Sequence, residues 1–538
     1  MSATTTRAAA RGAERALVRR RLLDVRVMTV ACAYVFAIYS YVQPSGYSSI
    51  YKTTAERVAF AHSFGTSKGL RLLYGLPYDL ATVDGYAAWR VGGVLAIFGA
   101  VYAMLAGVRL TRTEEESGRL ELVLAAPVGR SNVGWATLAA IAAGTAVAWV
   151  AQLAGLAVGG VGLGGAAYLA LATVSVIPVC AAVGVLASQI APNRALALQL
   201  AGGTVAVLFV LRVLADVVGL TWLRWLTPLG WAELLRPFAG ARPEVLLLPA
   251  AATGVLLALA WRITVARDIG TGLLRDRDRS APHLAMLGSP LGLSLRRQRG
   301  VLIAWAGTLA AFSYLLGTIA KSISPADVSK SVNREIAKLG TGSITTPTGY
   351  VAFVFSFFAL FICVFVCTQV AAARREEASQ RLETMLAAPL GRRRWLAGWI
   401  VLALLAAAAL ALACGLLGWA GTSTAGVHLG LGRLLEAGAN MLPVAVLFLG
   451  IATLAYAVAP RISGPFSYAL LAVAYLWELV GALTGAPRWV LDVTPFAHIG
   501  LVPVEPFRTV GALLMIAIGA AAGAAALQLF RRRDLVGD

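Results

Sequence analysis

Apolar residues follow one another along this chain in runs that are long enough to cross a membrane. A helix needs about 20 mainly apolar residues to span the hydrocarbon core of a bilayer, and about twelve runs of roughly 17–27 residues meet that requirement. The pattern predicts an all-α polytopic membrane protein with about twelve transmembrane helices. The expected spans are 27–43, 89–109, 132–157, 165–189, 195–219 and 245–265, then 300–320, 348–373, 395–420, 434–458, 464–485 and 509–530.

The composition agrees with this class of protein. The chain is 59% hydrophobic and 13% charged, and its mean hydropathy is +0.76, more apolar side chain than a soluble core can bury. A net charge of +20 would suggest a nucleic-acid partner in a soluble protein. Here the cations gather in loops beside the expected spans, so we expect membrane lipid as a partner and no nucleic acid.

Arginine-rich segments give the expected orientation. They stand before the first span, between spans six and seven, and after the last span. With six spans in each half, all three segments lie on the same side of the membrane, which the positive-inside rule assigns to the cytoplasm. We therefore expect a multi-pass protein of the cell (inner or plasma) membrane with cytoplasmic N- and C-termini.

One internal repeat stands out in the sequence. Residues Arg112–Arg130 read RTEEESGRLELVLAAPVGR and residues Arg374–Arg392 read RREEASQRLETMLAAPLGR, with 13 of 19 positions identical. Shorter matches extend the duplication, namely Thr-Pro at 227 and 494 and Arg-Asp at 267 and 533. Because each half has an even number of spans, the halves are predicted to be parallel six-helix repeats.

The predicted organisation has five parts. A basic N-terminus with an interfacial helix (1–26) precedes the first six-helix half (27–265). A cytoplasmic linker with a second interfacial helix (266–299) leads to the second half (300–530), and a cytoplasmic tail (531–538) follows.

The repeated segment predicts a short amphipathic helix in each half, at about 113–126 and 375–388. Apolar residues recur at i, i+3 and i+4, charged residues lie opposite, and Pro127 and Pro389 end the helices. We interpret them as solvated docking helices for a soluble partner; the alternative is retained ancestral surface sequence. The residues assigned to docking are Glu114, Glu115, Arg119, Leu120 and Glu121, and Glu376, Glu377, Arg381, Leu382 and Glu383.

These residues carry a family resemblance. The pattern E-x-x-G/S-x-x-E-x-L-L-A-x-P-V-x-R after the second span resembles the cytoplasmic coupling region of ABC-2 type permeases, as does R-R-D-(I/L)-x-x-G after the sixth. The double-length, Arg/Ala/Gly-rich format resembles actinobacterial antibiotic and multidrug exporters of the tetronasin or polyketide type. The resemblance implies two copies of a separate ATP-binding subunit holding ATP and Mg, and outward transport of amphipathic small molecules. Gln380 stands where the first copy has Gly118, and Ala378 where it has Glu116, which implies unequal contributions from the two helices.

Several motifs of other classes are missing. No P-loop pattern G-x-x-x-x-G-K-[ST] occurs, so we expect no ATP binding by that route, no cofactor in this chain and a transport subunit that is not an enzyme. The four histidines show no metal-ligand spacing. The alternative function is a proton-coupled secondary multidrug transporter with twelve spans. The major-facilitator turn between spans two and three is not found, since an acidic helix is predicted there.

Charged residues within the spans are candidates for a gate or pathway. Arg212 in span five and Glu478 in span eleven occupy equivalent positions of the repeat with opposite charge. One hypothesis pairs them across the axis between the halves. In the other, Arg212 pairs with Asp216 at i, i+4 and Glu478 reaches outward.

Aromatic residues suggest an apolar cavity for an amphipathic substrate. The alternative is that they face lipid or pack between helices. The candidates for a substrate cavity are Phe98, Tyr102, Phe357, Phe361, Tyr468 and Tyr475.

Overall fold

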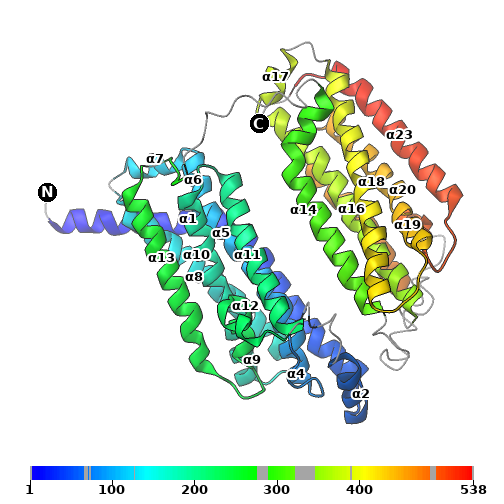
Figure 1. Ribbon diagram of the computed structural model, residues 1–538. Coiled ribbons are helices and arrows are strands. Elements are labelled where there is room, and N and C mark those ends of the chain that lie inside the picture. The colour runs from blue at the N-terminus through cyan, green and yellow to red at the C-terminus, as the bar shows by residue number, and fades with distance from the viewer. Residues whose placement is uncertain are drawn as a thin grey trace. The chain divides into compact units, whose positions relative to one another are not determined.

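The computed structural model shows an all-α protein, which confirms the predicted class (Figure 1). The chain divides into two compact units, Met1–Ser280 and Ala281–Asp538, and each is described here by itself. The structure describes residues 3–65, 71, 74–126, 128–217, 219–268, 270–274, 289–320, 346–387, 391–484 and 492–535. Pro127, Pro389 and residues 275–288 of the predicted linker lie outside the described residues.

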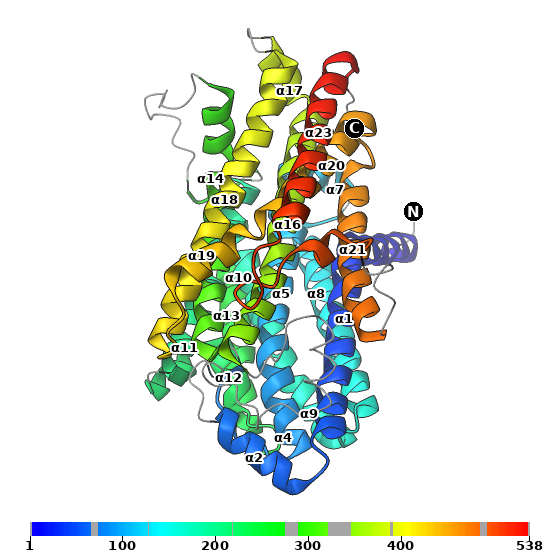
Figure 2. The same cartoon turned by 90° about the vertical axis from the view of Figure 1, so that its right-hand side faces the viewer.

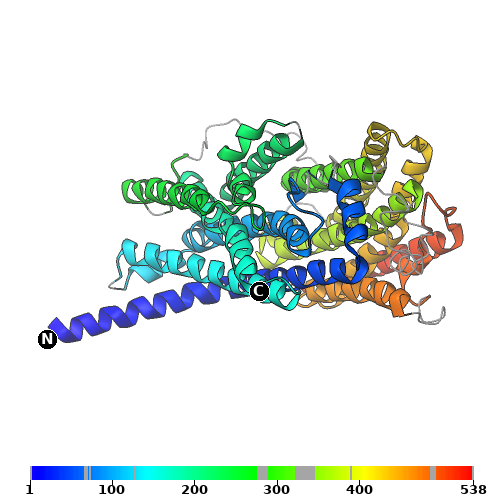
Figure 3. The same ribbon diagram turned by 90° about the horizontal axis from the view of Figure 1, so that it is seen from below.

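The first unit begins with one helix, α1, of 48 residues (Ala3–Ile50), where the sequence predicted an interfacial helix and a separate span. Its N-terminal part projects beyond the other helices of the unit (Figure 3). The remaining elements are α2 (Thr54–Gly65), α4 (Val83–Ala87), the π-helix η1 (Ala88–Gly92), α5 (Gly93–Leu110), α6 (Arg112–Glu116), α7 (Arg119–Leu124), α8 (Arg130–Val158), α9 (Leu163–Val174), α10 (Val176–Ile190), α11 (Arg194–Val217), η2 (Thr221–Leu226), α12 (Pro228–Leu234), η3 (Pro243–Leu246) and α13 (Leu247–Ala266).

Glycines allow the central helices of the first unit to lie in contact. A Cβ atom added to Gly107 of α5 would lie 2.4 Å from the carbonyl oxygen of Ala181 on α10. One added to Gly184 of α10 would lie 2.5 Å from the carbonyl oxygen of Met104 on α5. Small residues therefore bring these two backbones together, as is usual for helices packed within a membrane.

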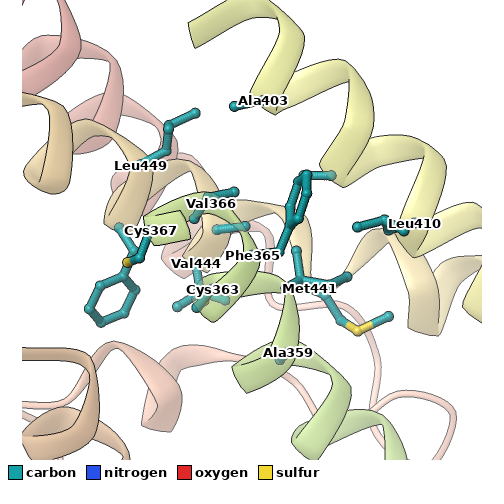
Figure 4. Packing of buried hydrophobic residues seen from close by; sticks show 14 of the residues in the cluster. Ala359, Cys363, Phe365, Val366, Cys367, Ala403, Leu410, Met441, Val444 and Leu449 are labelled. Carbon is teal, nitrogen blue, oxygen red and sulfur yellow. The ribbon is translucent and has the colours of Figure 1, made fainter. Parts of the chain in front are cut away.

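The second unit has fewer described elements, and its long helices follow a similar order. Its elements are α14 (Pro290–Ile319), α16 (Pro347–Ala378), α17 (Arg381–Leu386), α18 (Arg392–Thr424), α19 (Leu431–Ala439), α20 (Leu442–Val458), α21 (Ser463–Thr484), η6 (Pro495–His498) and α23 (Thr509–Arg532). Helix α23 runs beside α20, as Figure 2 shows. The core forms around α16, where Cys363, Phe365, Val366 and Cys367 pack among side chains of α18 and α20 (Figure 4).

Most predicted spans correspond to single helices. Among the described residues, eleven helices are long and apolar enough to cross a membrane, and the expected span at 464–485 coincides with α21. The fourth span of each half consists of two helices, α9 with α10 and α19 with α20. The Thr-Pro repeats lie just after the fifth span of each half, where Thr227 caps α12 and Thr494 caps η6 through the side-chain oxygen.

Candidate functional site

Each repeated loop contains a break where a continuous amphipathic helix was expected. In the first half α6 ends at Glu116, and Gly118 adopts the left-handed conformation (φ 70°) before α7 begins. In the second half α16 continues to Ala378, and Gln380 adopts the same conformation (φ 58°) before α17. The expectation of single helices at 113–126 and 375–388 was therefore wrong, because a residue in the left-handed conformation ends a helix. We call residues 112–130 and 374–392 the coupling loops.

The first glutamate of each loop contacts the first helix of its half. Glu114 Oε2 lies 3.4 Å from Arg20 Nη2 and 3.6 Å from Arg21 Nη1, both on α1. At the equivalent position, Glu376 pairs with Arg297 of α14. The following loop arginine reaches the same carboxylate in both halves, Arg119 at 3.7 Å and Arg381 at 3.2 Å.

The second glutamate of each loop contacts the residue that follows the last helix of its half. Glu115 Oε1 lies 2.5 Å from Arg267 Nη2, and Arg112 binds its other oxygen at 2.8 Å. Glu377 accepts two hydrogen bonds from Arg533, at 2.7 and 2.8 Å, and a third at 2.6 Å from the hydroxyl of Tyr456. The repeated Arg-Asp motif thus supplies the partner of the repeated glutamate.

A third repeated residue completes this joint. Arg130 Nη1 donates to the carbonyl oxygen of Arg267 at 3.3 Å, and Arg392 Nη1 donates to that of Arg533 at 2.6 Å. Each arginine is the first residue of the third span of its half. Its side chain satisfies a backbone carbonyl group just after the last span, where the helix leaves such groups without a partner. Each coupling loop is therefore tied to the first, third and last spans of its own half. We call each set of contacts a loop joint.

These contacts bury side chains that were expected to be solvated. Glu114 is 5% exposed and Glu377 is 2% exposed, because each neutralises arginines of neighbouring helices. The expectation of a solvated acidic face was wrong for these residues. Leu382 is fully buried and Leu120 half-buried. Exposed residues include Arg119, Glu121 and Leu122 in the first loop and Arg381, Glu383 and Thr384 in the second.

Sequence reasoning noted both repeated motifs but did not join them. The available signal was that the two glutamates and the Arg-Asp pairs were duplicated together. A glutamate in the loop and an arginine after the last span occur in both halves, as is expected if the two side chains form an ion pair.

Arg212 belongs to a buried group of four charges in the first unit. Its guanidinium lies 2.9 Å from Asp216 and 2.6 Å from Glu233 of α12, and Arg224 lies 2.7 Å from Asp216. The contact between Arg212 and Asp216 is the one that the second hypothesis expected. Glu233 and Arg224 also belong to the group, and the sequence analysis did not single them out. Burial raises the pKa of Glu233 and Asp216 adds to this, while the two arginines oppose it. A Cβ at Gly75 would overlap Glu233, so glycine is needed beside the group.

Glu478 has a simpler environment in the second unit. It is half-buried and accepts a hydrogen bond of 3.0 Å from the hydroxyl of Thr494. Its approach to Arg212 across the two halves stays a prediction. Among the described residues, no group of three or more His, Cys, Asp and Glu side chains could hold a metal ion.

The six aromatic candidates do not gather in one place within either unit. Phe98, Phe361 and Tyr468 are exposed, by 54%, 42% and 38%. Tyr102 is buried and hydrogen-bonds Thr29 at 2.9 Å. Phe357 contacts Tyr475, with ring centroids 6.0 Å apart. Their role as a substrate cavity stays a prediction.

Comparison with known proteins gives the family. Residues 15–262 match the family described as ABC-2 family transporter protein. Over 490 residues the chain is 31% identical to the "Multidrug efflux system permease protein Rv1217c" of Mycobacterium tuberculosis (strain ATCC 25618 / H37Rv), covering 90% of this chain and 88% of that protein. The chain belongs to the ABC-2 transporter family. Residues 287–531 of this ABC-2 permease also match the family described as "Multidrug efflux system permease Rv1217c, C-terminal domain".

The family assignment confirms the resemblance drawn from the coupling loops. It also leaves the proton-coupled secondary transporter without support. In this ABC-2 permease, each loop joint connects the exposed residues of its coupling loop to the first, third and last spans of the same half.

Proposed function

We propose that this chain is the transmembrane subunit of an ATP-driven exporter that moves amphipathic compounds out of the cell. ATP and Mg are bound and hydrolysed on a separate soluble ABC subunit, present in two copies. The termini and both coupling loops face the cytoplasm, in keeping with the arginine distribution.

The observation that carries this proposal is the loop joint, which occurs in both halves. A partner that moves the exposed part of a coupling loop also pulls on Glu115 or Glu377, and through Arg267 or Arg533 on the last span. Two similar joints suit two copies of one partner. The name of the M. tuberculosis relative supports efflux of several drugs.

The partner and its copy number can be tested together. We expect the tagged chain, purified in mild detergent from its own host, to carry a soluble ABC ATPase. Native mass spectrometry should give one permease with two ATPase chains. A lone chain that transports drugs at full rate in proteoliposomes would refute the proposal.

The docking surface can be tested by reversing exposed charges. We expect Glu121→Lys and Glu383→Lys each to lower substrate-stimulated ATPase activity at least about tenfold, because the reversed charge opposes that of the docked partner. Glu244→Lys is the matched control, since Glu244 is also exposed but precedes α13 at its other end. All three variants should melt at the wild-type temperature. Full stimulation in both loop variants would show that the partner docks elsewhere.

A further inference from the structure

The first unit has an apolar furrow between α8 and α13. A cavity of about 510 Å³ lies at the coupling-loop end, and a second of about 420 Å³ continues from it. Leu138 of α8 and Leu257 of α13 line both cavities, so the two form one furrow. Helices α8 and α13 form the two walls of the furrow. Both pack against α10, while they make few contacts with each other.

The furrow is long enough to hold an acyl chain from one leaflet, which takes about half of the hydrocarbon thickness of a bilayer. Its lining along α8 extends from Arg130 to Trp149. At 1.5 Å per residue this is about 28 Å, close to the hydrocarbon thickness of a bilayer. Away from the coupling loop the lining is apolar except for Thr145 and Thr253.

The coupling-loop end of the furrow is polar, and Glu115 and Asp268 line it beside three arginines. Trp135 and Trp261 stand on its two walls, 72% and 43% exposed, in the position that tryptophans take at a membrane surface. Arg130 lies at the mouth; its hydrogen bonds are to the carbonyls of Thr264 and Arg267, and it forms no ion pair with a described carboxylate. Deeper, Arg21 is 1% exposed and its Nε atom has no hydrogen-bond partner.

The second unit fills the equivalent place with its own side chains. Trp395, Trp399 and Phe530 occupy the positions of Val133, Thr137 and Thr264 in the repeat. The rings of Trp395 and Phe530 stack with centroids 5.7 Å apart, and both side chains are buried. The space lined by Trp399 in this unit is only about 10 Å³. Within the part of the chain that the structure describes, the furrow is therefore found in the first half, where smaller residues at three positions leave it open.

We propose that this furrow binds one anionic phospholipid from the leaflet at the coupling-loop end of the bilayer. The phosphate contacts the guanidinium of Arg130, the glycerol lies between Trp135 and Trp261, and an acyl chain fills the space beside Leu138 and Leu257. A charged, planar guanidinium suits a phosphate oxygen pair, and a zwitterionic lipid gains less because its own cation competes. Because Arg130 also belongs to the loop joint, the bound lipid stabilises the contact between the coupling loop and α13. The inference does not depend on what the protein transports.

The test measures retained lipid on the full-length chain. We expect wild-type protein incubated with equal amounts of phosphatidylglycerol and phosphatidylcholine to keep one phosphatidylglycerol in native mass spectrometry. Thr137→Trp with Thr264→Phe copies the second half into the furrow and should weaken that binding at least about tenfold. The control is Val150→Trp with Val255→Phe, which adds the same rings at exposed positions of α8 and α13 and should leave lipid binding unchanged.

A test variant and a matched control variant address the contact between Arg130 and the lipid headgroup. Arg130→Gln should abolish the preference for phosphatidylglycerol, whereas Arg392→Gln, which loses the equivalent carbonyl bond beside the filled cavity, should keep it. Should the double filling variant fail to purify, Thr264→Phe alone is judged by the same criterion. Equal retention of both lipids by wild type would overturn the proposal, and so would undiminished binding in the filling variant.

Discussion

The two glutamates of each coupling loop are charged residues held against charged partners of other helices. Glu377 is the most completely satisfied, since its two oxygens accept bonds from Arg533 and Tyr456. Taking such a pair out of water costs several kcal/mol, which these bonds offset only while every partner stays in place. At this scale the sequence predicted the residue types and their repetition. It could not show that they were buried, because burial depends on where the sixth span ends in space.

Glu377→Gln should destabilise the protein strongly. Arg533 then keeps a mostly buried charge without a counter-charge, at a cost of up to about 3–5 kcal/mol in the free energy of unfolding. The control is Glu383→Gln on the same loop, whose exposed side chain should change stability by about 0.5 kcal/mol or less. Thermal unfolding in one detergent compares the two. Equal melting temperatures would mean that the Glu377–Arg533 pair carries no net stability.

The raised pKa of Glu233 predicts that the stability of the protein depends on pH through the group of four charges. Its pKa is raised in the folded protein by burial, so the folded state holds this proton more tightly than the unfolded chain does. The contribution of Glu233 to stability therefore falls as pH rises from about 4.3, the value of an unperturbed glutamate, through the raised pKa. The difference in melting temperature between wild type and Glu233→Gln should shrink or reverse as pH rises. A difference that does not vary between pH 5 and pH 8 would contradict this.

At the scale of elements, hydropathy predicted where the helices cross the membrane, because long apolar runs have few other stable structures. It did not predict the breaks in the coupling loops or in the fourth spans. Residues 112–124 have the periodicity of one amphipathic helix. The break at Gly118 accompanies ion pairs that hold Glu114 against α1 and Glu115 against Arg267, the residue after α13. Contacts far apart in sequence therefore overrode a local pattern.

The break can be tested by exchanging residues between the halves. Gln380 pays a steric cost at φ 58° that glycine does not, about 1–2 kcal/mol for an ordinary side chain. Glycine is also more flexible in the unfolded chain, which offsets about half of this gain. Gln380→Gly should therefore stabilise the protein by about 0.5–1 kcal/mol, and Gly118→Gln should destabilise it similarly. Opposite signs would indicate that these residues act through side-chain contacts.

At the scale of the whole molecule, the duplication visible in the sequence corresponds to two units with a similar order of long helices and the same loop joints. The sequence also showed where the halves differ, but not what the differences do. Trp395 and Val133 are both acceptable in an apolar span, and only packing reveals that one fills a space and the other leaves it open.

The pairing of Arg212 with Glu478 is a question at this scale, since the two residues belong to different halves. The local contacts favour coupling within the first half, so we expect Arg212→Gln and Glu233→Gln to be strongly non-additive in melting temperature and transport rate. Arg212→Gln and Glu478→Gln should be additive within about 0.5 kcal/mol. A larger coupling between the latter two would establish a contact between the halves.

The open furrow of the first half and the filled space of the second bear on why both halves belong to one chain. A transporter assembled from two identical polypeptides has either two open furrows or none, because each copy carries the same residue at position 137 or 399. Once both copies lie in one gene, mutations in one are no longer imposed on the other. A permease can then keep an open furrow in one half and a filled space in the other in every molecule, at fixed stoichiometry. A single chain that carries both halves thus has a permanent difference between them, which the association of two identical polypeptides could not supply.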